Sequence, residues 1–503
     1  MTQNPQPRRH APLEMSPETF RNIGHQLVDQ IALFLESLPN RKVTSDFAAA
    51  DLRHRLPAGP LPVTGADPAK LIADAASLII ENSLFNGHPR FMGYITSSAA
   101  PIGALADLLA SSVNPNVGAW VLSPIASEIE AQTVRWVSEL IGYPHTAGGV
   151  LVSGGNMANF LGFVAARRAK VPYDIREKGL RHGQSQMLIY AAKSTHTWVQ
   201  KAADLFGLGT DAIRWIPVTR HHQMDTDALR TQIQADLSAG LTPFLVVGTA
   251  GTVETGTVDP LGEISAICKE FKLWFHIDGA YGAPVGILPE APADFKYLAE
   301  ADSIAVDPHK WLYAPLEAGC TLVKNPQHLI DAFSFRPKYY VLDNHGDNDA
   351  MNYFEVGMQN SRGFRALKVW LALQQVGREG YVTMIREDIA LAKQMFDLVA
   401  ATPQLEAVTN SLSITTFRYV PENLKGSPEP IAKYLNELNE AVLNRLQKEG
   451  DLFLSNAIVD DRYLMRACIV NFRTSSADIT AIPGIVLRAG ASVDAEMRPA
   501  SLR

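Results

Sequence analysis

The run "SIAVDPHK", residues 303–310, joins a short apolar strand to four residues that can carry chemistry. Comparable runs recur between about 145 and 325: "GVLVSGG", "MLIYAAKS", "RWIPV", "FLVVGTAGT", "LWFHIDGAYG" and "GCTLVKN". Most are continuously apolar, which is typical of strands buried on both faces, and helical patterns such as "DTDALRTQIQADLSAG" separate them. This alternation predicts an α/β fold with a mainly parallel sheet covered by helices. The polar residues stand at the strand ends, where open α/β sheets bind ligands.

The composition indicates a globular protein. The 503 residues are 47% hydrophobic and 19% charged, so the chain is long enough for more than one domain. A formal net charge of -7 argues against nucleic acid as a partner, because phosphate binding needs clustered positive charge. Three cysteines without paired spacing support neither a disulfide framework nor a zinc site, so we expect no metal.

The N-terminus carries basic residues but no apolar run behind them, so it does not have the pattern of a secretory signal. No stretch reaches the uninterrupted apolar length of a membrane helix. We therefore expect a soluble cytoplasmic protein without a membrane partner.

Residues 1–85 are expected to form an N-terminal helical segment. Ser16 is a plausible N-cap before Pro17, and apolar residues then recur at intervals of three to four. The stretch "DPAKLIADAASLIIENS" predicts a second helix. Two helices with such large apolar faces cannot bury them on each other alone, so a partner subunit is a good candidate for covering them.

A large α/β domain is expected over 86–384 and a smaller one over 385–503. Within the large domain, "FRPKYYVLDNHGDNDAMN" at 335–352 surrounds two tyrosines with Asn, Asp and Gly, a composition typical of a lid loop. The stretch "SRGFRALKVWLALQQVG" after it predicts a helix. In the smaller domain, "IAKYLNELNEAVLNRLQ" predicts a helix and "YLMRACIVNFR" a strand.

The residues at the strand ends suit one ligand. The turn "SGGN" at 153–156 precedes a helix, so its backbone N–H groups can approach an anion. Asp278 ends an apolar strand, where a carboxylate needs a cationic partner or hydrogen bonds. Lys310 follows another, and desolvation favours its reactive amine form. Each feature alone is more often a tight turn, a helix cap or an ion pair. Together they match pyridoxal phosphate, whose phosphate, pyridine nitrogen and aldehyde need these groups.

Several longer motifs occur along the chain: "HPRFMGY" (88–94), "SPIASEIE" (123–130), "GGVLVSGGNMANFLGFVAARR" (148–168), "HIDGAYG" (276–282), "DPHKWL" (307–312), "SRGFRALKVWLAL" (361–373) and "LMRACIVNFRT" (464–474). On these motifs the sequence resembles the group II pyridoxal phosphate-dependent amino acid decarboxylases. The resemblance implies fold type I of the pyridoxal phosphate enzymes and decarboxylation of an L-amino acid to an amine and CO2. It also implies a homodimer with its active site at the subunit interface.

The resemblance assigns roles to individual residues. Lys310 would bind the cofactor aldehyde, Asp278 would pair with the protonated pyridine nitrogen, and His196 would stack on the ring near the substrate carboxylate. Val253 stands where other members have a second threonine. The remaining cofactor contacts that the resemblance implies are His309, Gly155, Asn156 and Thr197 around the phosphate, Ala280 beneath the ring, Thr252 in the cofactor-side loop, and Asp307, where many members have Asn.

In this family a lid tyrosine serves or supports the return of a proton to the substrate carbon. The stretch "RPKYYVL" offers Tyr339 and Tyr340, and alignment on Pro337 favours Tyr339. Members that lack this tyrosine release aldehydes, so the retained pair implies an amine product.

The resemblance places the substrate pocket around 88–120. It implies contacts from Phe91, Ser97 and Gly118, the last of which replaces a common aromatic residue, and from Arg362. No arginine is clearly committed to a side-chain carboxylate, which favours an aromatic L-amino acid over glutamate or aspartate. Arg90 and Arg362 keep the acidic substrates open.

The alternatives are a decarboxylase of acidic amino acids, an aromatic acetaldehyde synthase or aminotransferase on the same fold, and a pyridoxal phosphate-binding pseudoenzyme. The retained tyrosines argue against the synthase, and the pair His309 and Lys310 together with His196 argues against the aminotransferase. The presence of Lys310 and Asp278 argues against the pseudoenzyme. No G-x-G-x-x-G opens the first βα unit, which disfavours a nucleotide-binding Rossmann domain.

Overall fold

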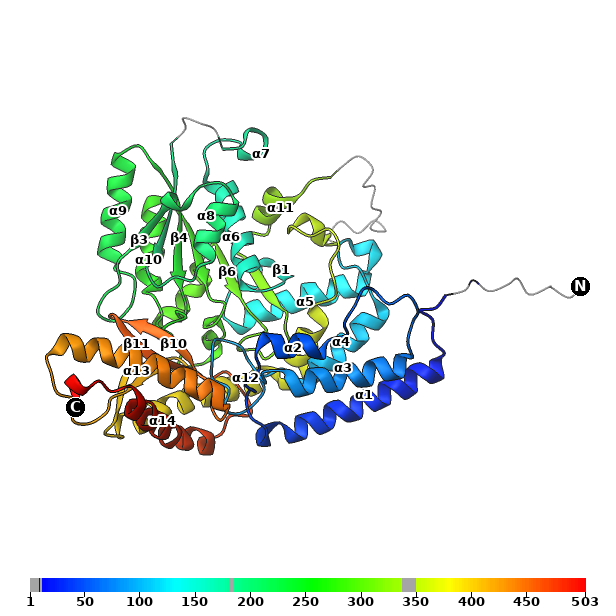
Figure 1. Cartoon of the computed structure of the whole chain (residues 1–503). Helices are drawn as coiled ribbons and strands as arrows, with labels where there is room; N and C mark the ends of the chain where they lie inside the picture. The colour runs from blue at the N-terminus through cyan, green and yellow to red at the C-terminus, as the bar shows by residue number, and fades with distance from the viewer. Residues whose placement is uncertain (1–8, 10, 181–184, 337–349) are drawn as a thin grey trace, which may run out of the picture.

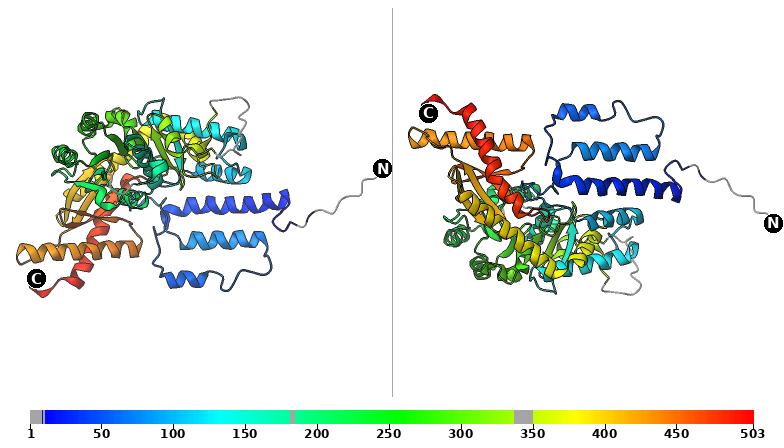
Figure 2. Two further views of the ribbon diagram at one scale, coloured as in Figure 1. Left: turned by 90° about the horizontal axis from the view of Figure 1, so that it is seen from above. Right: turned by 90° about the horizontal axis from the view of Figure 1, so that it is seen from below.

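The computed structural model describes residues 9, 11–180, 185–336 and 350–503. A seven-stranded sheet lies at the centre of the larger part of the molecule, and a four-stranded antiparallel sheet lies beside it (Figure 1). The first three helices form a layer to one side of the main body (Figure 2).

Each of the seven strand-like runs forms a strand of the large sheet, whose order is β1-β7-β6-β5-β4-β2-β3. Neighbours pair in parallel except at β7, which is antiparallel to both β1 and β6. The predicted mainly parallel sheet is confirmed. The strands are β1 (Gly148–Val152), β2 (Met187–Ala192), β3 (Ile213–Ile216), β4 (Thr242–Thr249), β5 (Trp274–Asp278), β6 (Ser303–Val306) and β7 (Gly319–Val323).

Both faces of this sheet are buried, which explains its continuously apolar strands. Val246 and Ile277 pack into one core cluster, whereas Leu245 and Val247 pack into another. The first cluster includes side chains of α5 (Pro124–Leu140), α9 (Thr226–Ser238) and α10 (Leu261–Phe271). The second includes side chains of α6 (Gly155–Lys170), α8 (Trp198–Leu205) and α11 (Gln327–Phe333). A one-turn helix, α7 (Ile175–Lys178), follows α6.

The parallel register brings the carboxyl ends of the central strands together. Thr249 pairs with Asp278, and Asp278 pairs with Ala305. At the end of β1, Val152 pairs with Gly319, the first residue of β7. The segments after β1, β4, β5 and β6 therefore leave the sheet at the same edge.

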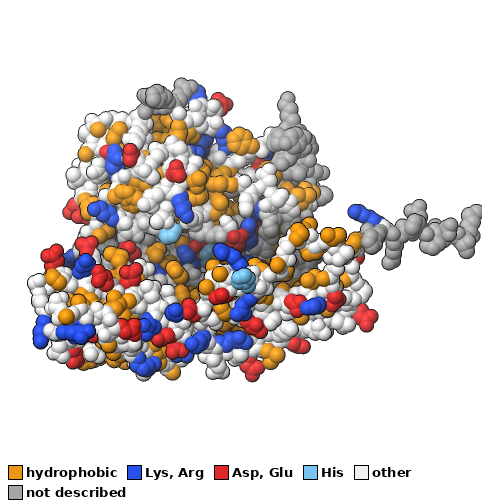
Figure 3. All heavy atoms as spheres, viewed as in Figure 1, with side chains coloured by type: hydrophobic (Ala, Val, Ile, Leu, Met, Phe, Trp, Pro, Cys, Tyr) orange, Lys and Arg blue, Asp and Glu red, His pale blue; other side chains and the backbone are white. Residues whose placement is uncertain are grey.

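The N-terminal helices begin where the sequence predicts. Ser16 caps α1 (Pro17–Ser37) by accepting a hydrogen bond from the backbone N–H of Thr19, and Asp67 caps α3 (Pro68–Asn82). Neither helix contains a buried residue, so their apolar faces stay open in the single chain. Figure 3 shows hydrophobic side chains exposed over this helical layer. The third helix of this layer is α2 (Ala49–Arg55), and α4 (Pro101–Val113) follows later in the chain and packs on α12 (Ala366–Ala400).

The smaller sheet has the order β10-β11-β9-β8. The predicted helix is confirmed as α13, whereas the predicted strand at 463–473 ends earlier, at Cys468. Helix α12 begins at Ala366, passes through the expected boundary at 385 and is interrupted at Gly377, whose φ is 67°. The division into domains stays a prediction. The elements are α12 (Ala366–Ala400), β8 (Leu405–Ser411), β9 (Ile414–Tyr419), α13 (Pro428–Glu449), β10 (Ser455–Val459), β11 (Arg462–Cys468) and α14 (Ser476–Met497).

Candidate active site

A cavity of about 510 Å³ opens at the carboxyl edge of the large sheet. Its walls come from the segments that follow β1, β2, β4, β5 and β6. Nine of the residues that the sequence predicts for the cofactor line it: Gly155, Asn156, His196, Thr197, Asp278, Ala280, Asp307, His309 and Lys310.

Lys310 lies in the turn that follows β6. Its backbone N–H donates to the carbonyl of Asp307, and its Nζ lies 3.0 Å from Asp307 Oδ2. The other carboxylate oxygen, Asp307 Oδ1, is buried without a hydrogen-bond partner among the described residues. The ammonium group of Lys310 is thus paired inside the cavity, next to a carboxylate that has accepting capacity to spare.

Asp278 ends β5 with only 8% of its surface exposed. The indole Nε1 of Trp198 donates to Oδ2 at 2.8 Å, and the backbone N–H of Ala280 donates to Oδ1 at 3.2 Å. These donors stabilise the charged carboxylate and fix its direction at the cavity wall. The sequence alone did not point to Trp198, because the two partners are far apart in the chain.

Two histidines border the cavity, and burial lowers the pKa of both. For His196, the nearby Asp278 opposes that effect and Lys310 adds to it. The ring of His309 accepts a hydrogen bond at Nδ1 from the backbone N–H of Ala318, which leaves its proton on Nε2, 3.6 Å from Asp307 Oδ2. Both rings are therefore neutral near pH 7. A neutral His196 offers a flat face for an aromatic ring without adding charge.

The turn between β1 and α6 forms an open cradle. Gly154 has a φ of 140°, which side chains rarely permit, and a Cβ on Gly155 would lie 2.6 Å from Asp307 Oδ2. The first residues of α6, Gly155 to Met157, line the cavity, and the backbone N–H groups of a helix's first turn favour an anion. An amine, a held carboxylate, a flat histidine and this cradle converge, so these residues fit pyridoxal phosphate.

The remaining predicted residues that the structure describes lie outside this cavity lining, whereas Tyr339 and Tyr340 fall outside the described residues. The hydroxyl groups of Thr252 and Thr255 are hydrogen-bonded to each other. The hydroxyl of Ser97 donates to the carbonyl of His309 at 2.9 Å. Phe91 stacks on Phe453 with ring centroids 5.3 Å apart. Ser97 thus contacts the turn that carries His309 and Lys310, whereas Phe91 belongs to a separate small core.

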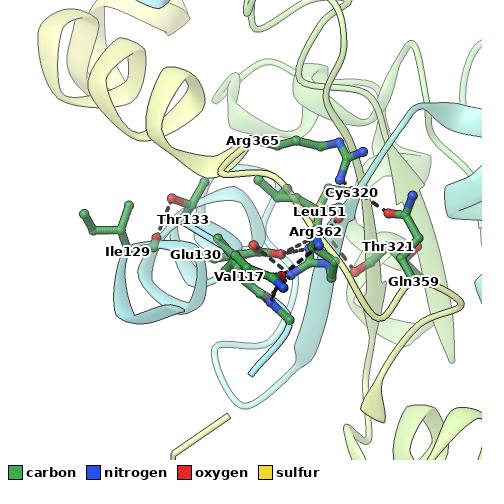
Figure 4. Close-up of polar contacts among 12 residues, drawn as sticks. Val117, Ile129, Glu130, Thr133, Leu151, Cys320, Thr321, Gln359, Arg362 and Arg365 are labelled. Carbon is green, nitrogen blue, oxygen red and sulfur yellow. Dashed lines mark hydrogen bonds and ion pairs between the residues drawn. The ribbon is translucent and has the colours of Figure 1, made fainter. Parts of the chain in front are cut away.

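Gly118 and Arg362 serve the packing of the fold in this structure. A Cβ on Gly118 would lie 2.0 Å from the carbonyl oxygen of Asn360, so close backbone packing accounts for the glycine. Arg362 forms an ion pair with Glu130 that is almost fully buried, and it donates to the carbonyls of Val117 and Leu151 (Figure 4). The guanidinium of Arg362 is therefore committed within the fold.

Other residues of the cavity were not singled out from the sequence. They include Met157, Lys201 and Thr249, which have no spacing signal of their own, whereas Ser153 belongs to the predicted turn at 153–156. Val253, where a threonine is common, lines the cavity, and its carbonyl accepts a hydrogen bond from Arg466. The described residues hold no cluster of three or more His, Cys, Asp or Glu suited to a metal. Their helices are too short or too polar to cross a bilayer.

Known proteins are similar to this chain in sequence and in fold. The family model of the pyridoxal-dependent decarboxylase conserved domain matches residues 56–420. An aromatic-L-amino-acid decarboxylase of Bacillus atrophaeus is 32% identical over 471 residues, which cover 93% of this chain and 95% of that one. A phenylacetaldehyde synthase of Petunia hybrida is 29% identical and covers 90% of this chain and 91% of its own.

A solved structure has a similar fold. The crystal structure of Oryza sativa TDC with PLP and tryptamine superposes with a TM-score of 0.88 at 26% identity, covering 96% of this chain and 99% of that one. The chain belongs to the pyridoxal-dependent decarboxylase family. It is a carboxy-lyase of fold type I whose cofactor is pyridoxal phosphate.

Proposed function

We propose that the protein decarboxylates an aromatic L-amino acid to the corresponding amine and CO2. The observation that carries the proposal is the meeting of the Lys310 amine, the Asp278 carboxylate and the His196 ring in one cavity. The similarity to an aromatic-L-amino-acid decarboxylase over nearly the whole chain supports the substrate class.

Pyridoxal phosphate, when bound, supplies a conjugated ring that accepts the electron pair left behind as CO2 departs. Lys310 would hold the cofactor aldehyde and release it to the substrate amine, since its Nζ faces the cavity next to Asp307. Asp278 would keep the proton on the pyridine nitrogen, because its carboxylate is fixed by Trp198 and Ala280. His196 would cover the ring face and exclude water from the reacting carbon.

The substrate carbon must regain a proton after CO2 leaves. Tyr339 and Tyr340 lie outside the described residues, so their role stays a proposal from the sequence. Replacing Tyr339 with Phe is expected to move the product from amine toward aldehyde, ammonia and peroxide with O2 as oxidant. Tyr340→Phe is the matched control. A shift caused by Tyr340→Phe alone would transfer the role to that residue.

The cavity wall supports an aromatic substrate. No described residue of the lining is an arginine, and the guanidinium of Arg362 forms an ion pair with Glu130 instead. Among the described lining residues, Lys201 is the cation besides Lys310. It could pair with the side-chain carboxylate of an acidic substrate, which keeps that alternative open. The similarity to a phenylacetaldehyde synthase keeps the aldehyde product as a second candidate.

A substrate panel tests the proposal. Purified protein with pyridoxal phosphate is incubated with L-phenylalanine, L-tyrosine, L-tryptophan, L-glutamate and L-aspartate, and CO2, amine, aldehyde and peroxide are measured. The proposal expects the highest kcat/KM for an aromatic substrate, with amine and CO2 in equal amounts. A higher kcat/KM for glutamate or aspartate would contradict it, and aldehyde with peroxide would favour the synthase.

We also propose a cytoplasmic homodimer whose active sites lie at the subunit interface. Open apolar faces on α1 and α3 support the dimer. The three cysteines are free and buried, in keeping with a reducing compartment.

A further inference from the structure

The two strands that supply Asp278 and Lys310 are each followed by a large aromatic side chain, and these two side chains touch. Tyr281 stands three residues after Asp278, and Trp311 stands directly after Lys310. Their rings stack with centroids 4.9 Å apart and an interplanar angle of 5°. Any movement of Trp311 would therefore shift the turn that carries Lys310.

A buried carboxylate from helix α12 anchors this turn. Asp388 is 3% exposed, and its Oδ2 accepts one hydrogen bond from Trp311 Nε1 at 2.8 Å and another from the hydroxyl of Tyr313 at 2.6 Å. One oxygen atom thus binds both Trp311 and Tyr313, which lie one and three residues beyond Lys310.

The backbone of the turn needs such an anchor. Tyr313 has a φ of 57°, a left-handed conformation that is unfavourable for a bulky residue. Its N–H donates to the carbonyl of Lys310 at 3.2 Å. Helix α12 adds a second contact, because the hydroxyl of Tyr381 donates to the carbonyl of Leu312 at 3.1 Å.

A carboxylate is a costly way to satisfy two donors. No cation forms an ion pair with Asp388 among the described residues, and burial raises its pKa to about 7. Elsewhere in the fold a backbone carbonyl satisfies a buried tyrosine, as Ala301 does for Tyr143. Asp388 binds both Trp311 and Tyr313, which follow Lys310 in the same turn, so we expect it to do more than fill the core.

We propose that Asp388 is a positioning residue that holds the Lys310 turn through Trp311 and Tyr313. The inference rests on the proposed role of Lys310. Asp388 lies outside the cavity lining and does not reach the reacting atoms. It acts by fixing where the lysine amine stands relative to Asp278 and His196.

Three substitutions test this role. Asp388→Leu keeps the branching of the side chain, at a larger volume, and removes the acceptor of both hydrogen bonds, whereas Trp311→Phe and Tyr313→Phe each remove one donor. Misplacing a catalytic group by about 1 Å can cost roughly 100-fold, so kcat is expected to fall about 10- to 100-fold in Asp388→Leu and less in the single-donor variants. KM is expected to change less than about threefold, because substrate binding is retained. The visible absorbance of the bound cofactor should shift or weaken in parallel.

Asp236 provides a control. It is also a buried aspartate that accepts a hydrogen bond from a tyrosine hydroxyl, that of Tyr190 at 2.9 Å, but it forms an ion pair with Arg214 as well and lies on α9 outside the cavity lining. Asp236→Leu is expected to lower the melting temperature without changing the cofactor spectrum or the kcat of the protein that remains folded. The inference is overturned if Asp236→Leu and Asp388→Leu lower kcat and alter the spectrum equally at equal loss of stability.

A double-mutant cycle gives a second readout that does not depend on one variant folding well. Combining Asp388→Asn with Trp311→Phe should cost less in kcat than the sum of the single effects, since both act through one contact. Full additivity would overturn the inference. Lys310→Ala separates the two proposals: if it keeps the visible cofactor absorbance, the role of Lys310 fails. If it loses that absorbance while Asp388→Leu behaves like Asp236→Leu, only the inference fails.

Discussion

At the residue scale, the Asp278 carboxylate depends on a neighbour that the motif does not contain. Trp198 reaches it from α8, and both side chains are buried. In the proposed site this carboxylate must keep its charge when the pyridine nitrogen binds. We therefore expect the indole N–H of Trp198 to contribute to cofactor affinity through Asp278.

Trp198→Phe tests this contribution. Removing a donor from a buried charged group costs about 1–3 kcal/mol, which corresponds to roughly 5- to 150-fold weaker binding of pyridoxal phosphate. Titration of the cofactor-free protein, followed by visible absorbance, measures the Kd. Trp370→Phe is the matched control, because its indole donates to Gln132 on another helix. Equal affinities of wild type and Trp198→Phe for pyridoxal phosphate would show that Trp198 does not contribute to cofactor binding.

His276 predicts a pH dependence of stability. Its ring lies between Asn159 Oδ1 and Ser303 Oγ, both at 2.7 Å, and burial lowers its pKa to about 4. The unfolded state binds this proton at a higher pH than the folded state does, so the stabilising effect is complete above about pH 6.5 and is lost as the pH falls toward 4.

The size of this effect is about 3 kcal/mol between pH 6.5 and 4. Asp388 and Asp259 oppose it, because burial raises their pKa to about 7 and about 6. Urea unfolding of wild type and His276→Gln at pH 7 and pH 5 isolates the contribution of the histidine. The variant should lose less stability than wild type on acidification, and an equal loss in both proteins would refute the assignment.

At the element scale, one buried ion pair joins four segments of the chain. Glu130 of α5 accepts from the backbone N–H of Leu151 in β1 and from the guanidinium of Arg362 (Figure 4). The guanidinium carbon also lies 4.7 Å from the ring centre of Tyr353. The pair fixes β1, and with it the glycine turn that follows. It also fixes the chain just before α12.

Arg362→Met tests whether this arginine is structural. Leaving Glu130 buried without its partner is expected to cost about 3–5 kcal/mol of unfolding free energy. The ratio of kcat/KM for aromatic over acidic substrates should stay unchanged in the folded variant. Arg365→Met, which removes the more exposed pair with Glu317, is expected to cost about 0–1 kcal/mol. A changed substrate ratio in Arg362→Met alone would restore the substrate-binding role.

The elements also mark what sequence reasoning could reach. Strands buried on both faces read as apolar runs, so all seven strands of the large sheet were predictable. The helix cap at Ser16 was also predictable, because it depends only on residues close by in the chain. The antiparallel direction of β7 was not, because pairing depends on partners distant in the chain.

The site follows the same division. Residues inside motifs, such as His196 and Lys310, fall where strand ends meet, so they line the cavity. Contacts between motifs escaped prediction: Trp198 with Asp278, Glu130 with Arg362, and Trp311 with Asp388. Charge pattern alone could not tell whether Arg362 faces a substrate or a buried glutamate.

At the scale of the whole molecule, open apolar faces lie on the helices at one side of the body. Leu105 and Leu109 of α4 are each more than half exposed, as are Phe20 of α1 and Leu71 of α3. Large exposed apolar side chains gathered on neighbouring helices are typical of an interaction site. A second copy of the chain would cover it.

Sedimentation analysis is expected to give twice the mass of the 54.9 kDa chain. The double substitution Leu105→Glu and Leu109→Glu should yield monomers with strongly reduced decarboxylation, because in the proposed dimer the interface would also complete the active site. Leu237→Glu, an exposed leucine on α9, serves as the control and should leave the dimer intact. A wild-type protein that sediments as a monomer with full activity would rule out this assembly.

The central claim joins the fold, the cavity and the reaction in one residue. Its most direct test is CO2 release from an aromatic L-amino acid by wild type and by Lys310→Ala, with pyridoxal phosphate present in both. The account predicts CO2 and amine in equal amounts from the wild type, and CO2 at the level of the protein-free control from the variant. Release by Lys310→Ala at the wild-type rate would contradict it.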